Sequence, residues 1–411
     1  MVTRGGLLRL QLPTLDVTMA LAALGLVLIG LLTVYSATSV PGAHEGLWSK
    51  QLLWFGMAVG IAYLAAAVHY RVYDSLAYPI YGLAILMLVL VLLVGTSAMG
   101  AQRWLELGPL KFQPSEIAKI AMVLVLARRF DDPKLNLRRI RDWFPPLILM
   151  LVPFALVAKE PDLGTSLSFP VILVAMYYWA GMPGGQLLLG LSPVFNVGLF
   201  FFTGSLWWFV AIFALMLAWI RPKLGTLLVF LALNGAVCVT VPKLWDQLHD
   251  YQKRRIETFL NPGQDPYGAG YQIIQSKIAI GSGGFVGKGY LRGTQKGLSF
   301  LPMRHTDFIY SVVGEELGLI GALTVVLLYA LVILRGYRIA AAARNRFASL
   351  MAVGLVSALF YHVIVNMLMT IGWAPVTGLP LPLLSYGGTA LIVNCTQLGL
   401  LQNVALRRQE Y

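Results

Sequence analysis

Long apolar runs dominate the chain, and short polar connections separate them. A helix that crosses a membrane needs about 20 predominantly apolar residues. The run from 143 to 242 is almost continuous, so it can be divided into spans in more than one way. The pattern predicts an all-α polytopic membrane protein with about 10–12 transmembrane helices. The twelve predicted spans are 15–36, 49–68, 75–95, 114–128, 143–158, 165–182, 186–203, 205–220, 224–242, 308–335, 347–371 and 385–405.

The composition excludes a soluble globular protein. Of 411 residues, 58% are apolar and 12% are charged, whereas a soluble domain has about 45–50% apolar and about 25% charged residues. The first apolar run, 19–34, is not followed by a clear small-residue cleavage site, so we expect an uncleaved first span. The two cysteines, Cys238 and Cys395, lie in apolar stretches, which disfavours disulfides and cysteine-rich metal sites.

The distribution of Lys and Arg predicts the orientation of the helices. Short loops rich in these residues face the cytoplasm, and here they follow the even-numbered spans. Both termini are therefore expected in the cytoplasm, and the segment 243–307 is expected outside it. The orienting residues are Arg128, Arg129, Lys134, Arg138, Arg139, Arg141, Arg221, Lys223, Arg335, Arg338, Arg344, Arg346, Arg407 and Arg408.

The extracytoplasmic loop 243–307 is itself basic and precedes the helix that starts near 308. It carries nine Lys or Arg residues and five acidic ones. This charge indicates either a site for an anion, such as a phospholipid head group, or a solvated surface. Within it, Gly281–Gly289 resembles a nucleotide loop but fits neither the dinucleotide nor the P-loop pattern. A flexible backbone near a ligand is the interpretation we favour for this segment.

Several ionisable residues interrupt the predicted spans, and such residues are functional candidates. Glu116 and Lys119 are three apart on one helix face and can form an ion pair. Asp162 lies in an outer connection where capping of the next helix is a sufficient role. Of Glu315 and Glu316, one is expected to face a polar cavity and the other to lie near the interface. No zinc-protease motif and no nucleophile-elbow motif occurs in the chain.

Asp307 ends the basic loop where an apolar helix begins. Its carboxylate could cap that helix, act as a general base, or bind a divalent metal ion. Arg103 lies beside Trp104 in another outer loop, where a guanidinium group can hold phosphate through two hydrogen bonds. A tryptophan at the membrane interface is ordinary. Arg103 and Trp104 are therefore consistent both with a simple interfacial position and with a phosphate site.

Motifs along nearly the whole chain resemble the SEDS family (shape, elongation, division and sporulation), and its RodA branch more than its FtsW branch. Glu160 departs from the pattern, because the family motif has Gln before Pro161. The matching segments are Gly100-Ala-Gln-Arg-Trp-Leu105, Gln113-Pro-Ser-Glu-Ile-Ala-Lys119, Pro161-Asp-Leu-Gly-Thr165, Asp265-Pro-Tyr-Gly-Ala-Gly-Tyr-Gln-Ile-Ile-Gln-Ser-Lys277, His305-Thr-Asp-Phe-Ile-Tyr310, Glu315-Glu-Leu-Gly318, Pro375-Val-Thr-Gly-Leu-Pro-Leu-Pro382 and Ser385-Tyr-Gly-Gly388.

The resemblance implies a peptidoglycan glycosyltransferase that polymerises lipid II into glycan strands at the outer face of the bacterial cytoplasmic membrane. It implies Asp307 as the catalytic residue, either a base or a metal ligand, with Mg²⁺ or Mn²⁺ as the conceivable cofactor. The cations that we expect to bind pyrophosphate are Arg103, Lys119, Lys277 and Arg304. Glu116, Asp162 and Ser385 are expected to be supporting polar residues.

The expected partners are lipid II, the nascent glycan strand, membrane lipids and a class B penicillin-binding protein, with no nucleic acid. We expect one membrane domain over 1–411, in which 182–242 contains an additional helix pair. Two other functions remain open, a lipid II flippase or other transporter and a non-catalytic scaffold for the transpeptidase. The position of the candidate residues on one face favours the enzyme, because transporters hold their substrate near the bilayer midplane.

Overall fold

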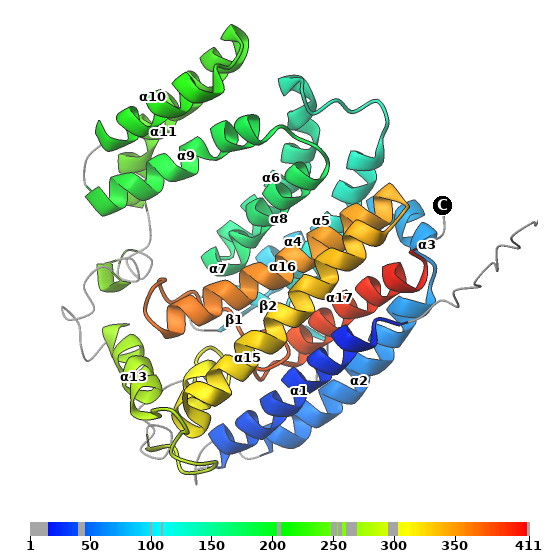
Figure 1. The fold of residues 1–411 in the computed structure, drawn as a ribbon, viewed down its shortest axis with the longest axis vertical. Coiled ribbons are helices and arrows are strands. Elements are labelled where there is room, and N and C mark those ends of the chain that lie inside the picture. Colours follow the sequence, from blue (N-terminus) through cyan, green and yellow to red (C-terminus); the bar gives the residue numbers. More distant parts are fainter. Residues whose placement is uncertain are drawn as a thin grey trace, which may run out of the picture.

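The protein is described by a computed structural model that covers residues 15–39, 46–98, 101–107, 110–203, 207–247, 253, 257–259, 269–294 and 303–408. Each of the twelve predicted spans forms a helix (Figure 1). Their bounds are α1 Val17–Thr38, α2 Leu47–Ala67, α4 Ala77–Val94, α5 Pro114–Asp131, α6 Phe144–Lys159, α7 Leu163–Ser166 with α8 Ser168–Trp179, α9 Gly184–Thr203, α10 Trp207–Ile220, α11 Leu224–Gln247, α15 Ile309–Ala342, α16 Arg346–Thr370 and α17 Gly388–Leu406. Shorter helices are α3 Tyr70–Ser75, η1 Ile140–Trp143 and α13 Ala269–Ser282.

The helices confirm a polytopic membrane protein. Among the described residues, seven helical segments are long and apolar enough to cross a membrane, and three shorter ones are also apolar. Helix α11 continues to Gln247, so the segment expected outside the cytoplasm from 243 onward begins with the last turn of this helix. Asp16 and Gln402 are hydrogen-bonded, so α1 begins at the end of the bundle where α17 ends.

The centre of the bundle is α16, which packs against α5, α8, α15 and α17 (Figure 1). In the most apolar stretch of this helix, 72% of the residues are buried inside the protein. Around it, α17 lies along α2 and α1 lies along α15. Gly399 permits the close approach of α17 to α2, because a side chain there would collide with the backbone at Ala62.

A small antiparallel sheet departs from the all-α prediction. It consists of β1 Thr96–Ala98, β2 Ala101–Leu107 and β3 Leu110–Phe112, between α4 and α5. The central strand β2 carries Arg103. The sequence predicted no secondary structure for this outer connection. It instead forms strands, and one of them holds Arg103.

Helices α9, α10 and α11 lie to one side of the main bundle (Figure 1). They have a small core of their own, formed by Leu189, Phe213 and Phe230. Asn234 Nδ2 donates a hydrogen bond to Ser192 Oγ over 2.8 Å, which joins α11 to α9. Most of the range 182–242 is thus helical, in α9, α10 and α11. That two of these helices are additional to the family pattern stays a prediction.

Helix α15 is broken at Gly318, whose φ of 65° and ψ of −161° suit only glycine. The Gly-rich segment after α13 satisfies the backbone groups released by this break. Leu319 N donates to Gly284 O over 2.9 Å, and Lys288 N donates to Glu315 O over 3.0 Å. The structure therefore gives the glycines of 281–289 a role in pairing with α15, which differs from the ligand-contact role that we expected.

Both acids before this break are buried inside the protein, and the position of either one near the membrane interface stays a prediction. Glu315 Oε1 accepts hydrogen bonds from Lys288 Nζ at 2.8 Å and from the Thr294 backbone at 2.7 Å. Glu316 accepts from Ser36 Oγ of α1 at 2.7 Å. The two carboxylates therefore tie α15 to the Gly-rich segment and to α1.

Gly318→Ala is expected to lower the free energy of unfolding by about 2 kcal/mol or more, because a side chain at this φ and ψ is strained. An added Cβ would also lie 2.7 Å from Phe285 O. Gly235→Ala in α11 is the control, since a Cβ there meets no atom within 4 Å. Thermal unfolding of the purified variants measures the difference, and equal melting temperatures would contradict the role assigned to the break.

Candidate functional site

Asp307 lies in the turn that leads into α15. Phe308 is the N-cap residue of this helix and no side chain caps it, so Asp307 does not have the capping role that the sequence allowed. The turn is closed by backbone hydrogen bonds from Thr306 N and Phe308 N to Met303 O, at 3.2 and 3.3 Å. These bonds fix the backbone on both sides of Asp307.

The segment 371–387, between α16 and α17, packs against this turn. Asn366 Nδ2 of α16 donates to both Asp307 O and Leu379 O, at 2.9 and 2.7 Å. Ser385 Oγ donates to Thr306 O at 2.6 Å and accepts from Leu381 N at 2.8 Å. A Cβ added to Gly378 would lie 3.5 Å from Asp307 Oδ2. Ser385 thus fixes the backbone beside the candidate acid, which is a supporting position.

Lys277 approaches the same segment from α13. Ser276, the preceding residue, bonds Thr370 O and Ser311 Oγ at 2.6 Å each, which anchors α13 between α15 and α16. A Cβ added to Gly372 would lie 2.6 Å from Lys277 Nζ. The side chain of Lys277 is exposed. The structure therefore brings a carboxylate and an accessible ammonium group to one connecting segment.

Asp162 caps α7, as the sequence predicted. Its carboxylate accepts from Thr165 N at 3.2 Å and from Gln113 Nε2 at 3.1 Å. Arg103 Nη2 donates to Pro161 O at 2.5 Å, and its Nη1 lies 3.9 Å from Asp162 Oδ1. Arg103 therefore braces this turn, which we call the 160–165 turn.

The 160–165 turn also contacts the segment 371–387. A Cβ added to Gly164 would lie 3.0 Å from both Thr377 O and the Leu379 side chain. Tyr361 Oη of α16 donates to Gly164 O at 2.9 Å. Asp307, Lys277 and the 160–165 turn thus surround a single segment, although they are far apart in the sequence.

Glu116 and Lys119 form the predicted ion pair, with 2.7 Å between Lys119 Nζ and Glu116 Oε1. Both side chains are almost fully buried, at 5% and 2% exposure. Lys119 Nζ also lies 2.7 Å from His362 Nε2 of α16, so these groups join α5 to α16. The ammonium group is thus engaged inside the bundle, one helical turn along α16 from Asn366.

Arg304 is buried and lies three residues before Asp307 in the sequence. Its side chain contacts α1. Its Nε donates to Ala37 O at 2.9 Å. Of the four cations expected at a pyrophosphate, Lys277 is the one for which the structure shows both exposure and contact with the segment beside Asp307. The roles of Arg103, Lys119 and Arg304 toward a ligand stay predictions.

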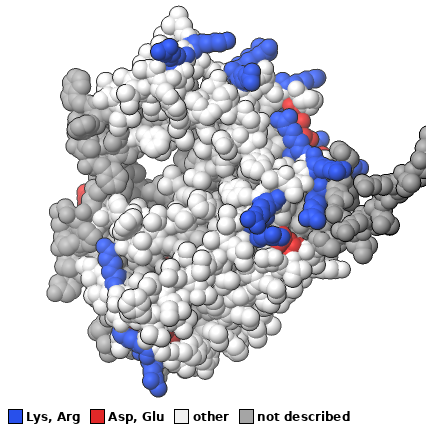
Figure 2. Space-filling model, viewed as in Figure 1, with Lys and Arg blue, Asp and Glu red and all other residues white. Residues whose placement is uncertain are grey.

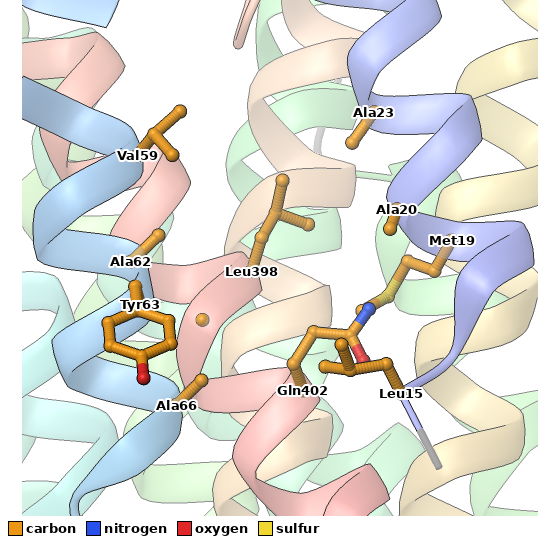
Figure 3. A pocket seen from close by; sticks show the side chains of 11 residues that line it. Leu15, Met19, Ala20, Ala23, Val59, Ala62, Tyr63, Ala66, Leu398 and Gln402 are labelled. Carbon is orange, nitrogen blue, oxygen red and sulfur yellow. The ribbon is translucent and has the colours of Figure 1, made fainter. Parts of the chain in front are cut away.

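An apolar cavity of about 310 Å³ lies far from Asp307, between α1, α2 and α17 (Figure 3). Met19, Ala62 and Leu398 are among its lining residues. It lies near the start of α1, whereas Arg304 contacts the other end of that helix at Ala37. This cavity is therefore separate from the candidate site by most of the length of α1.

A family model described as "Cell cycle protein", which covers FtsW, RodA and SpoVE, matches residues 13–207 and 197–410. The chain belongs to the SEDS family. This SEDS protein is 40% identical over 404 residues to "Peptidoglycan glycosyltransferase MrdB" of Escherichia coli (strain K12), covering 96% of this chain and 94% of the relative. It is 34% identical to "Probable peptidoglycan glycosyltransferase FtsW" of Geobacter metallireducens, covering 95% of each chain.

Two solved structures are similar to the SEDS protein over its whole length. One, from "Structural coordination of polymerization and crosslinking by a peptidoglycan synthase complex", has a TM-score of 0.75 at 31% identity, covering 97% of this chain and 99% of that one. The other, Thermus thermophilus Rod shape determining protein RodA, has a TM-score of 0.65 at 27% identity with the same coverage. The RodA-like resemblance and the helical membrane fold are thereby confirmed.

Glu160, which departs from the family motif, is a titratable group beside the SEDS protein's site, and the sequence did not predict its burial. Its side chain is 1% exposed, and neither carboxyl oxygen has a hydrogen-bond partner among the described residues. Burial, reinforced by the nearby Asp162 carboxylate, raises the pKa of Glu160 to about 8. A protonated Glu has nearly the shape of Gln, so Glu160 can occupy the position where the family motif has Gln.

Glu160→Gln is expected to stabilise the SEDS protein at pH 8. An unfolded Glu loses its proton near pH 4.3, whereas folded Glu160 holds it to about pH 8. Wild-type stability therefore falls as the pH rises through this window, and the variant lacks that fall. Its advantage should grow by a few kcal/mol between pH 5 and 8, at about 1.4 kcal/mol per pKa unit.

Thermal unfolding of the purified chain in detergent at several pH values measures this effect. The exposed Glu106 of β2 supplies the control, and Glu106→Gln should run parallel to the wild type. A Glu160→Gln advantage that stays constant from pH 5 to 8 would show that Glu160 is ionised throughout the folded state.

Proposed function

We propose that this SEDS protein, a peptidoglycan glycosyltransferase, polymerises lipid II into glycan strands at the outer face of the cytoplasmic membrane, for cell elongation and shape. The observation that carries the proposal is that Asp307 and Lys277 both adjoin the segment 371–387, at Gly378 and at Gly372. A sugar transfer from a pyrophosphate donor needs a base for the attacking hydroxyl and a cation for the leaving group. These two residues supply both kinds of group beside one backbone segment.

Asp307 acts as the general base in this proposal. The C4 hydroxyl of lipid II attacks the anomeric carbon of the growing glycan, and its proton passes to the Asp307 carboxylate. The bond from that carbon to the pyrophosphate oxygen breaks, with inversion at the anomeric carbon. A positioned base contributes about 10²–10⁴-fold to such a step. The turn and Asn366 supply the positioning, since they fix the backbone of Asp307.

Lys277 stabilises the departing pyrophosphate. Its exposed ammonium group can turn toward the phosphate oxygens, where charge develops as the bond breaks. The Arg103 guanidinium group, by contrast, donates a hydrogen bond to the 160–165 turn. The Lys119 ammonium group contacts Glu116 and His362. We assign these two residues to the shape of the site.

The lipid tail has a candidate binding groove close by. An apolar cavity of about 440 Å³ is lined by α2, α4, α5 and α17, and includes Trp54 and Thr389. Thr389 is four residues from Ser385, which holds the turn of Asp307. Lys111, which pairs with Glu106, also lines this cavity. The cavity thus includes the first turn of α17, the helix that follows Ser385.

A divalent cation is a further proposal. Among the described residues no group of three His, Cys, Asp or Glu side chains could hold a metal. Mg²⁺ commonly binds through one or two carboxylates, with substrate phosphates and water as its other ligands. Asp307 could hold such an ion only in that manner, where it would supply positive charge to the pyrophosphate. No step proposed above depends on it.

We also propose a class B penicillin-binding protein as the partner that crosslinks the product, with both termini of this chain in the cytoplasm. The similar solved structure of a peptidoglycan synthase complex, whose title pairs polymerization with crosslinking, supports this partner. The common end of α1 and α17 supports placing the termini on one side.

Polymerisation of lipid II by the purified chain tests the function, with and without the transpeptidase, and with EDTA or added Mg²⁺. Glycan strands on gels establish the transferase, and their loss in EDTA with recovery in Mg²⁺ establishes the metal. An absence of strands in every condition, combined with lipid II translocation in liposomes, would favour a flippase. Absence of both activities would favour a scaffold.

A further inference from the structure

We infer that the basic cavity where α9, α10 and α11 meet the connection after α5 binds the head group of an anionic phospholipid. The cavity has a volume of about 520 Å³ and lies at the end of the molecule opposite the candidate catalytic site. Its lining includes Arg138 from the connection, Gln186 from α9, Trp219 from α10, and Arg221 and Lys223 from the α10–α11 link. The proposed function makes no use of this cavity.

Three cations face the cavity and no acid lines it. Within the described residues, none of Arg138, Arg221 and Lys223 forms an ion pair. Other arginines of this end do pair with acids, as Arg129 does with Asp132 at 2.7 Å. Figure 2 shows Lys and Arg side chains gathered where α10 ends and where the 132–143 connection lies. The cavity therefore concentrates positive charge that the protein does not itself neutralise.

Helix ends add to this charge. Helices α9 and α11 begin at Gly184 and Leu224, and residues of both first turns line the cavity, among them Gly185 and Thr226. The first N–H groups of a helix have no partner within it, and they carry partial positive charge. Gln186 adds a buried amide oxygen without a described partner, which a hydroxyl group of a glycerol head group could satisfy. A phosphodiester with hydroxyl groups fits this combination.

The surroundings select a lipid over a free anion. Trp219 lines the cavity and is 76% exposed, and Leu215 lies one turn away on the same face of α10 at 73% exposure. These side chains form an apolar surface that starts at the cavity and runs along the helix, where an acyl chain can lie. Basic pockets between transmembrane helices bind anionic lipid head groups in this way.

Titration of the purified full-length chain with dioleoyl phosphatidylglycerol in detergent tests the inference, with the melting temperature as the readout. Dioleoyl phosphatidylcholine has the same chains without net charge, and sodium phosphate has the anion without chains. We expect phosphatidylglycerol alone to raise the melting temperature. In Arg221→Gln/Lys223→Gln, half-saturation should need about 30-fold more phosphatidylglycerol, the combined effect of two cations near a lipid surface.

Arg338→Gln/Arg408→Gln is the matched control, because both residues are exposed and neither lines the cavity. It removes the same charge and should respond like the wild type. Arg138→Gln, in an exposed connection, tests the cavity if the double variant fails to fold. Equal phosphatidylglycerol responses in the wild type and the cavity variants would overturn the inference. So would an equal response of the wild type to phosphatidylcholine, or to inorganic phosphate.

Discussion

Asp307→Asn is expected to reduce lipid II polymerisation by about 100-fold or more, because an amide cannot accept the proton of the attacking hydroxyl. Asn keeps the size of the side chain. The contacts that hold the turn involve the backbone of Asp307, which accepts from Asn366, and the neighbouring Thr306, which accepts from Ser385. The substitution should therefore leave the fold intact while it removes the chemistry. Asp307→Ala should lose activity to a similar extent.

The measurement is the rate of glycan strand formation from lipid II by the purified variants, with the cognate transpeptidase present. Asp142→Asn is the control, since Asp142 lies at the far end of the bundle and accepts from the Asn136 backbone. It should polymerise at the wild-type rate. Retention of activity by Asp307→Asn, with a melting temperature equal to that of the wild type, would remove the base from the mechanism and leave the residue a positional role.

The positions of the helices could be predicted because a bilayer-spanning helix requires a long apolar run, and each such run here became a helix. The break in α15 could not, since Gly318 is one of many glycines. Its conformation depends on backbone partners in 281–289, which pair with it only after folding. The sheet at 96–112 was missed because two of its three strands have only three residues each.

Local contacts of the site were also predictable, whereas distant ones were not. The spacing of Glu116 and Lys119 predicted their ion pair, and the position of Asp162 predicted its cap; the structure confirms both. The contact of Lys119 with His362 spans 243 residues, so no spacing rule could indicate it. The burial of Glu160 was not predicted, because burial of a charged residue in a connection has no signature in one sequence. The raised pKa of Glu160 arises from the packing of the 160–165 turn around it.

Lys119→Ala is expected to destabilise the protein by about 3–5 kcal/mol, the cost of leaving a buried charge without its partner. Glu116 would remain with 5% of its side chain exposed and without the ammonium group that now lies 2.7 Å away. Arg129 and Asp132 provide a matched control, since they have the same spacing and the same 2.7 Å separation but are 27% and 32% exposed. Arg129→Ala should cost about 1 kcal/mol or less.

The double variant Glu116→Gln/Lys119→Met tests whether the site needs the charges of this pair or only side chains of this size at these positions. Replacement of both ions by neutral groups of similar size is often neutral or stabilising, so the double variant should recover most of the stability lost in Lys119→Ala. If the pair only shapes the site, lipid II polymerisation should recover as well. A double variant that melts like the wild type but forms no strands would show that the buried charges take part in catalysis. A Lys119→Ala protein as stable as the wild type would instead contradict the cost expected for leaving Glu116 without its partner.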